Sequence, residues 1–237
     1  MNLTDISILA VVPARGGSKS IPRKNLCEIN GVSLVGKAAI IVNSIPWINA
    51  AVISTDDEEI AAEGIKYGLN APFRRPMEIS GDTATSVDMW KHAWTESELF
   101  YGTRFEISVL LEPTSPLRTV DDVEKTLLKL LMGNHSSAAT VSPTPAHFTP
   151  QKTLTVENDI IDFYHAMGSQ HSLRQSIPKY YHRNGLCYAV TRDHLFNKNR
   201  IIDNKTAAIV IERNVVNIDE PYELEFAEWL INRNLAQ

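Results

Sequence analysis

The sequence predicts an α/β protein built on a doubly wound, mostly parallel β-sheet. Short apolar runs that suit buried strands alternate with longer segments of helical periodicity as far as Val141. A length of 237 residues with 43% apolar side chains fits one folded domain with a small appendage. We therefore expect residues 1–237 to form a single domain.

The first elements set this rhythm. Residues 6–12 form a nearly continuous apolar run, as expected of a strand buried on both faces. A helix is predicted over 32–42 and a second strand over 51–55. Asp56 is a candidate cap for the next helix, and Glu59 three residues later completes a capping box.

The alternation continues with a helix over 85–100 and a strand over 107–111. Thr119 is a good cap for the following helix, because two acidic residues that the helix dipole favours come directly after Val120. A short strand over 138–141 ends the regular part.

Residues 143–182 interrupt the pattern, and we expect them to form a small insertion with short strands that makes a dimer contact. Helical periodicity is weak there, and four prolines punctuate it: Pro143, Pro145, Pro150 and Pro178. Strand character returns over 186–190 and 207–211, and an amphipathic helix is predicted over 222–235.

Composition excludes several classes of function. The net charge of −5 argues against binding of nucleic acid, which relies on a basic surplus. Cys27 and Cys187 have no metal-binding or redox spacing, so we expect reduced thiols and a cytoplasmic protein. The apolar run over 6–12 is too short for a signal peptide or a membrane span, so no membrane partner is expected.

A glycine- and cation-rich loop, residues 13–25, follows the first strand. Gly16 and Gly17 allow the backbone to approach a ligand closely. Within ten residues the loop carries four cations, Arg15, Lys19, Arg23 and Lys24. This composition suits a triphosphate, although the loop is neither a Walker A motif nor a dinucleotide fingerprint. A solvated surface loop with incidental charge is the alternative.

The loop resembles the N-terminal signature of the acylneuraminate (CMP-sialic acid and CMP-nonulosonic acid) cytidylyltransferases, a family related to the CMP-Kdo synthetases. That signature reads roughly Pro-Ala-Arg-x-x-Ser-Lys-Gly-Ile/Leu-Pro-x-Lys-Asn, and Ser20 departs from it at the glycine. The resemblance implies a Rossmann-like nucleotidyltransferase fold. It also implies nucleotide binding by Ala14, Arg15, Gly16, Gly17, Ser18, Lys19, Lys24 and Asn25.

A second segment resembles the family's base-recognition stretch. By match, Arg75, the backbone carbonyl of Ala84 and the hydroxyl of Ser86 read the edge of cytosine. One acceptor and two donors complement the amino group, ring nitrogen and carbonyl of that base. Without the resemblance, the same residues read as a turn followed by a capped helix.

The segment from Leu110 to Arg118 resembles the family's Leu-Gln-Pro-Thr-Ser-Pro-Leu-Arg, with Glu112 replacing the glutamine that contacts the acidic sugar. A carboxylate repels an acidic substrate unless it is paired or protonated. We expect Glu112 to meet a cation, either a metal ion or an amino group of the substrate. Direct neutralisation by Arg118 or Arg75 is the alternative.

The sugar site is implied by two further segments, 174–178 and 184–188. Arg174 matches an arginine that faces the substrate, and its fork suits the carboxylate of a 2-keto acid. His182 stands where the family has a second arginine, and Arg183 follows one place later. The residues assigned to the sugar are Glu112, Arg174, Gln175, His182, Asn184 and Tyr188.

Asp219 matches the second aspartate of the family's Asp-x-Asp metal motif, whereas Asn217 replaces the first. Oxygen ligands suit Mg²⁺, so we expect Mg²⁺ at Asp219, with Asn217 and Glu112 as further candidate ligands. Capping of the last helix is the alternative role for Asp219. The candidate catalytic residues are Arg15, Lys24 and Asp219.

The resemblance implies transfer of CMP from CTP to a nine-carbon 2-keto acidic sugar of the sialic, legionaminic or pseudaminic type, in a homodimer. Two alternatives stay open because Glu112, His182 and Asn217 depart from the family pattern. One is a nucleotidyltransferase for a different sugar or a phosphonate, and the other is a non-catalytic nucleotide-binding module.

Overall fold

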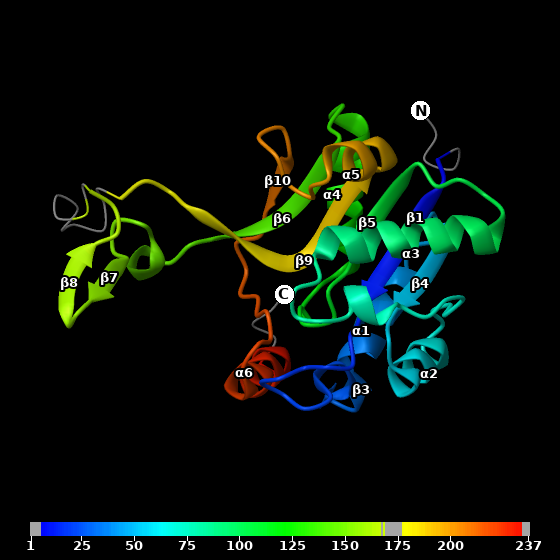
Figure 1. The fold of residues 1–237 in the computed structure, drawn as a ribbon, viewed down its shortest axis with the longest axis horizontal. Helices are drawn as coiled ribbons and strands as arrows, with labels where there is room; N and C mark the ends of the chain where they lie inside the picture. The colour runs from blue at the N-terminus through cyan, green and yellow to red at the C-terminus, as the bar shows by residue number, and fades with distance from the viewer. Residues whose placement is uncertain (1–5, 167, 169–176, 234–237) are drawn as a thin grey trace.

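A six-stranded sheet with the order β10-β6-β9-β5-β1-β4 forms the centre of the molecule in the computed structural model, which describes residues 6–166, 168 and 177–233 (Figure 1). The central strand β1 (Ile8–Pro13) runs parallel to β4 (Ala50–Ser54) and to β5 (Ile107–Leu110). At the other end, β10 (Ala207–Val210) runs parallel to β6 (Ser137–Pro143).

One strand reverses the direction. β9 (Tyr181–Thr191) lies between β5 and β6 and is antiparallel to both. The sheet is therefore mixed and mostly parallel, which confirms the predicted fold class.

Helices cover both faces of this sheet. α1 (Leu34–Asn43), α2 (Glu58–Lys66) and α4 (Val120–Met132) pack on the face that includes Ile8 and Val12. α3 (Ser86–Tyr101) and α5 (Arg192–Lys198) pack on the face that includes Leu9 and Val11. Successive residues of β1 thus point into opposite cores, which explains its uninterrupted apolar sequence.

The strand order reverses beside β1. The chain passes from β1 to β4 on one side and then crosses to β5 on the other side. Ligands in open α/β sheets bind in the crevice that this reversal opens at the carboxyl ends of the strands. The loop after β1 and the segment after β5 both leave from that edge.

The helix predicted over 32–42 begins at Leu34, two residues after the predicted start. Val32 and Ser33 form β3 (Val32–Ser33), which pairs with β2 (Glu28–Ile29). Asn30 (φ 54°) and Gly31 (φ 73°) make the turn between them, since both positions need positive φ. The Ser33 side chain then caps α1 by accepting from the Gly36 amide at 3.0 Å.

The cap of α2 also differs from the prediction. Asp57, not Asp56, caps this helix, and its carboxylate accepts from the amides of Glu59 and Ile60 at 3.0 Å each. Asp56 is unavailable because it accepts from the Gly16 amide at 2.9 Å. The capping box predicted at Thr119 is confirmed, with Asp122 as its second member.

A third, smaller core joins the two ends of the chain. The last helix, α6 (Pro221–Asn232), packs through Ala227 and Leu230 against Ile29 and Leu34. Ile218 is fully buried in the same cluster. The segment that precedes α6 is therefore fixed beside the loop after β1.

Between β6 and β9 the chain forms an arm that projects away from the sheet (Figure 1). A hairpin of β7 (Leu154–Glu157) and β8 (Ile160–Phe163) forms its end, so the predicted short strands are confirmed. Every residue of both strands is exposed. Within the described residues, no helix combines the length and apolar content that crossing a bilayer requires.

Candidate active site

A cavity of about 570 Å³ opens at the carboxyl ends of β1 and β5, where the strand order reverses. Three distant parts of the chain form most of its lining: the loop after β1, the turn before α3 and the segment after β5. Asn217 and Asp219 complete it from the region that precedes α6.

Side chains from two sides fix the loop after β1. The buried Asn25 donates from Nδ2 to the Arg15 carbonyl at 3.0 Å. The Gly16 amide donates to Asp56, and a Cβ atom at Gly16 would lie only 2.9 Å from Asp57 Oδ2. Glycine at this position therefore reflects a close backbone approach, whereas Gly17 is exposed and has open space around it.

Arg15 and Lys19 line the cavity and share one carboxylate. Arg15 Nη1 lies 2.9 Å from Asp82 Oδ1, and Lys19 Nζ lies 2.5 Å from Asp82 Oδ2. Lys19 and then Arg15 hold the pKa of the Asp82 carboxyl below its ordinary value, because both favour the ionised form. Both cations thus pair with one residue of the opposite wall.

Lys24 bridges the two ends of the chain. Its ammonium group donates to Asp219 Oδ1 at 3.0 Å and to the Ile218 carbonyl at 2.9 Å. The fourth predicted cation, Arg23, turns out of the cavity and pairs with Asp57 at 2.6 Å and with Glu59. Three of the four loop cations therefore face the cavity, as do Ser18 and Asn25.

The wall opposite the loop carries the residues expected to read the base. Ala84 and Ser86 both line the cavity, and Ser86 is the first residue of α3 behind the cap Thr85. Arg75 is buried there and donates from Nε to Ser54 Oγ at 3.1 Å and from Nη2 to the Ser54 carbonyl. Burial lowers the pKa of Arg75 to about 10, so the guanidinium stays charged at neutral pH.

Glu112 stands at the start of the segment after β5 and lines the cavity. Among the described residues, none forms a hydrogen bond or an ion pair with this carboxylate. Burial raises the pKa of Glu112, the Asp219 charge adds to the rise, and the charges of Arg118 and Arg183 oppose it. A half-buried carboxylate without a direct partner is ready to meet a cation.

Neither arginine expected to neutralise Glu112 pairs with it. Arg118 is buried, and its guanidinium donates to the backbone carbonyls of Glu112 at 2.6 Å, of Gly185 at 3.2 Å and of Leu186. Arg75 is held by Ser54 as described above. Arg118 therefore acts on the Glu112 carboxylate only through its charge.

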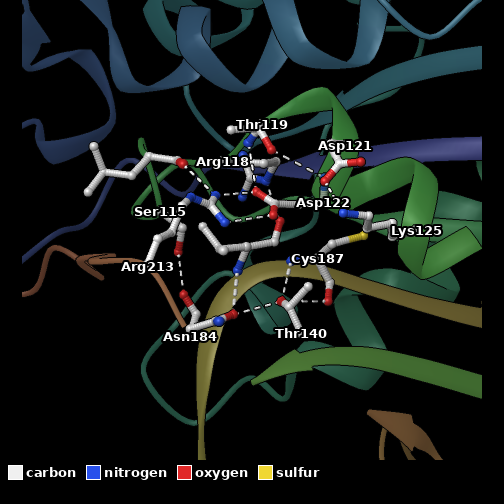
Figure 2. Close-up of polar contacts among 12 residues, drawn as sticks. Ser115, Arg118, Thr119, Asp121, Asp122, Lys125, Thr140, Asn184, Cys187 and Arg213 are labelled. Carbon is white, nitrogen blue, oxygen red and sulfur yellow. Dashed lines mark hydrogen bonds and ion pairs between the residues drawn. The ribbon is translucent and has the colours of Figure 1, made fainter. Parts of the chain in front are cut away.

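The floor beneath Glu112 is packed tightly around Gly185. This residue has φ 70°, and a Cβ atom there would lie 2.5 Å from both Glu112 Oε2 and Ser115 Oγ. Ser115 Oγ donates to the Asn184 carbonyl at 3.0 Å and to Asn217 Oδ1 at 3.3 Å. Figure 2 shows Ser115 and Asn184 together with Arg118 and the Asp122–Arg213 ion pair.

The predicted sugar residues on β9 surround the site without lining the cavity itself. Asn184 is buried, and its side chain accepts from Thr140 Oγ1 at 2.6 Å and donates to Ser142 Oγ at 3.0 Å. His182 is exposed near the base of the arm, where Nδ1 lies 3.2 Å from Thr144 Oγ1.

Tyr188 is buried behind the cavity, and its burial and the Glu112 charge raise the pKa of its hydroxyl. Arg174 and Gln175 lie outside the described residues. Arg183, one place after His182, is close enough to act electrostatically on both Glu112 and Tyr188. Asp82, Ser115 and Gly185 shape the site but were not expected from the sequence, because their contacts are made with distant segments.

The metal candidates offer a suitable but incomplete donor set. Asp219 and Glu112 supply carboxylate oxygens, and Asn217 supplies an amide oxygen. In the part of the chain that the structure describes, no three His, Cys, Asp or Glu side chains gather closely enough to hold a metal alone. Mg²⁺ usually binds one or two protein carboxylates and takes its other ligands from water and substrate phosphates.

A crevice with cations on one wall and carboxylates on the other suits transfer of a nucleotide from its triphosphate, which depends on positioning and charge neutralisation. Together with the doubly wound sheet, it defines the class of nucleotidyltransferases. The sequence narrows this class, because the cytidylyltransferase family model matches residues 9–188, and the chain belongs to that family.

Several characterised proteins resemble the chain over nearly its full length. Post-translational flagellin modification protein B of Campylobacter coli is 27% identical, over 97% of each chain. The CMP-N,N'-diacetyllegionaminic acid synthase of Campylobacter jejuni is 28% identical over 97% of each chain. The pseudaminic acid cytidylyltransferase of the same species is 29% identical, covering 95% of this chain and 97% of the relative.

The fold is also that of a solved structure, CMP:2-keto-3-deoxy-manno-octonic acid synthetase complexed with CTP. The two structures agree with a TM-score of 0.69 at 18% sequence identity, over 97% of this chain and 100% of the other.

The packing around Gly185 predicts the effect of one added methyl group. Gly185→Ala should lower the free energy of unfolding by about 2–4 kcal/mol, because it combines a positive φ with overpacking against Glu112 and Ser115. Urea unfolding measures this. Gly81→Ala, with open space around its Cβ, is the control and should change stability by less than about 0.5 kcal/mol. Equal stability of the two variants would contradict the packing described here.

Proposed function

We propose that this cytidylyltransferase transfers CMP from CTP to a nine-carbon 2-keto acidic sugar of the nonulosonic class and releases pyrophosphate. The observation that carries the proposal is the cavity between β1 and β5, which combines loop cations, Arg75 with Ala84 and Ser86, and Asp219. Relatives of nearly equal length are named for legionaminic and pseudaminic acids, which supports this substrate class.

In the proposed reaction, the anomeric 2-hydroxyl oxygen of the sugar attacks the α-phosphorus of CTP. The new oxygen–phosphorus bond replaces the bond to the β-phosphate, pyrophosphate leaves, and the hydroxyl proton passes to solvent. Such a transfer needs alignment and neutralisation of charge more than covalent help from the protein.

The loop cations supply that neutralisation. Lys24 holds the α-phosphate, because its ammonium group already lies between the loop and Asp219. Arg15 and Lys19 hold the leaving pyrophosphate. Arg75, the Ala84 carbonyl and the Ser86 hydroxyl select cytosine by matching its donors and acceptors.

The carboxylate of the sugar is bound by arginine at the β9 side of the cavity. Arg174 was expected there by resemblance. Arg183 is a second donor, because its charge already reaches Glu112 and Tyr188 at the edge of the site. A guanidinium fork donates to both oxygens of a carboxylate at once.

Asp219, Asn217 and Glu112 are proposed to hold Mg²⁺, which would neutralise charge on the triphosphate when bound. Glu112 supplies the negative charge that Asn217 lacks relative to an aspartate pair. Its unpaired carboxylate near Asp219 supports this role. If Glu112 instead binds an amino group of the sugar, the Mg²⁺ concentration needed for activity should not depend on Glu112.

Two variants separate these roles. Glu112→Gln should raise the Mg²⁺ concentration needed for half-maximal activity by about tenfold or more, since it removes a ligand charge. Asn217→Asp should lower that concentration, because it adds a carboxylate. In the presence of CTP, Mn²⁺ should bind more weakly to Glu112→Gln and more tightly to Asn217→Asp than to the wild type, as measured by its electron paramagnetic resonance. Unchanged metal dependence in Glu112→Gln would exclude the metal role.

Pyrophosphate release with CTP and Mg²⁺ tests the function itself. Release should occur with one of the sialic, legionaminic or pseudaminic acids and not with 3-deoxy-octulosonic acid. UTP and ATP, offered in place of CTP, test the proposed reading of cytosine. CTP binding without release for every acid would instead favour a different acceptor or a non-catalytic module.

We further propose that the protein is a homodimer joined through the hairpin of the arm. In the β7–β8 register, four apolar side chains share one face: Leu154, Val156, Ile161 and Phe163. Between 41% and 66% of each is exposed. A two-stranded hairpin is marginal alone, and burial of its apolar face against a second copy would stabilise it.

A lysine on either face of the hairpin tests the dimer. Val156→Lys places a charge on the apolar face and should give a monomer, as measured by light scattering during size exclusion. Thr155→Lys adds the same charge to the opposite face and should leave the dimer intact. A monomeric wild type, or dimers for both variants, would contradict the proposed interface.

A cytoplasmic location is proposed as well. CTP is a cytoplasmic nucleotide, and the two cysteines are free thiols, as is usual in a reducing compartment.

A further inference from the structure

Asp82 occupies the cations that the proposed reaction assigns to pyrophosphate. Its two carboxylate oxygens contact Arg15 Nη1 at 2.9 Å and Lys19 Nζ at 2.5 Å, one cation for each oxygen. A bound phosphate group would present oxygens to the same two donors. The Asp82 carboxylate therefore has the negative charge and the contacts that a bound phosphate group would have. A phosphate that binds there would displace it.

Among the described residues, no contact within its own turn accounts for the position of the Asp82 carboxylate. The cap of α3 is Thr85, which accepts from the Asp88 amide at 3.1 Å, so Asp82 is not needed to start the helix. Among the described residues, the Asp82 carboxylate pairs with Arg15 and Lys19. Its contacts point across the cavity rather than into its own turn.

Moving this turn costs little. Gly81, Asp82 and Thr83 are exposed, and the Ala84 amide closes the turn on the Gly81 carbonyl at 3.2 Å. The Asp82 side chain is 49% exposed, and those of Arg15 and Lys19 are 38% and 79% exposed. Ion pairs as open as these are weak and easily screened.

A triphosphate is a stronger partner than one carboxylate. It carries several negative charges and binds cations through more oxygens, whereas Asp82 offers a single charge. The two anions repel each other when they compete for the same cations. Binding of the β- and γ-phosphates to Arg15 and Lys19 thus requires Asp82 to leave.

We propose that Asp82 is a positioning residue that holds Arg15 and Lys19 in the absence of nucleotide and is exchanged for the β- and γ-phosphates of CTP. This inference rests on the proposed function, since it needs the triphosphate to bind in this cavity. When pyrophosphate leaves, Asp82 returns to the same cations. The exchange keeps both cations paired between turnovers and lowers the affinity for the leaving group.

The other ion pairs of the loop serve as a contrast. Arg23 pairs with Asp57 and Glu59 outside the cavity, so no ligand competes for it. Lys24 pairs with Asp219, which is itself a proposed metal ligand. Asp82 differs from the other described carboxylates that pair with the loop. When the phosphates bind, Asp82 loses both of its partners, Arg15 and Lys19, and gains no new one.

Asp82→Asn tests the exchange, with Glu78→Gln as the matched control. Glu78 is exposed in the same segment, and its variant removes the same charge without breaking an ion pair. Binding of inorganic pyrophosphate, CTP and cytidine is measured by calorimetry in EDTA, so that metal binding does not contribute. Thermal unfolding of each variant verifies that it is folded.

Asp82→Asn should bind pyrophosphate and CTP roughly three- to tenfold more tightly than the wild type, because two exposed ion pairs no longer compete. Cytidine affinity should not change, and Glu78→Gln should bind all three ligands as the wild type does. The gain should shrink as salt rises from about 0.02 M to about 0.5 M.

Other outcomes overturn the proposal. Unchanged or weaker pyrophosphate binding by Asp82→Asn, with a wild type that binds CTP, would exclude the exchange and leave the proposed function standing. Weaker cytidine binding would assign Asp82 to the base-reading wall instead. A wild type that binds neither CTP nor pyrophosphate would overturn both proposals.

Discussion

The site depends on the hydrogen bonds that the buried guanidinium of Arg118 donates. It lies where the segment after β5 crosses β9, and it donates to the carbonyls of Glu112, Gly185 and Leu186. Backbone carbonyls that leave a sheet ladder in the interior must find other donors, and one guanidinium satisfies three of them. Burial lowers the pKa of Arg118 to about 10, which still leaves it charged at neutral pH.

This crossing fixes the floor from which the rest of the site is built. Gly185 lies against Glu112 and Ser115, and Ser115 reaches Asn217. The Ile218 amide donates to the Thr114 carbonyl at 2.7 Å, which ties the C-terminal segment to the same shelf. Lys24 then reaches Asp219 and the Ile218 carbonyl, so the loop after β1 contacts the segment that precedes α6.

Local signals in the sequence predicted the elements that local forces determine. Thr119 caps α4 because its partner Asp122 is three residues away, and the apolar run of β1 reports burial on both faces. The cap of α2 was predicted one residue early, because the Gly16 amide, 40 positions away, takes Asp56. The reversed direction of β9 had no local signature either, since strand direction is set by the path of the connections.

The residues of the site also divide into those that a local sequence pattern predicts and those that it does not. Arg15, Lys19 and Lys24 were predicted from one contiguous loop, and all three line the cavity, whereas Arg23 of the same loop does not. Asp82 pairs with Arg15 across 67 positions, and no pattern near Asp82 indicates this contact. Arg183 rather than His182 acts on Glu112, and the irregular pairing of β6 and β9 between Ala139 and Val141 shifts the register there. Such a shift changes which side chain of a strand faces the site.

A crystal structure of the protein with CTP bound, in the absence of sugar, would show directly whether this cavity binds the nucleotide. Cytosine is expected against Ala84 and Ser86, the α-phosphate at Lys24, the remaining phosphates at Arg15 and Lys19, and Asp82 turned away from both. A nucleotide bound elsewhere, or one whose phosphates avoid the loop after β1, would show that the cavity does not have the proposed role.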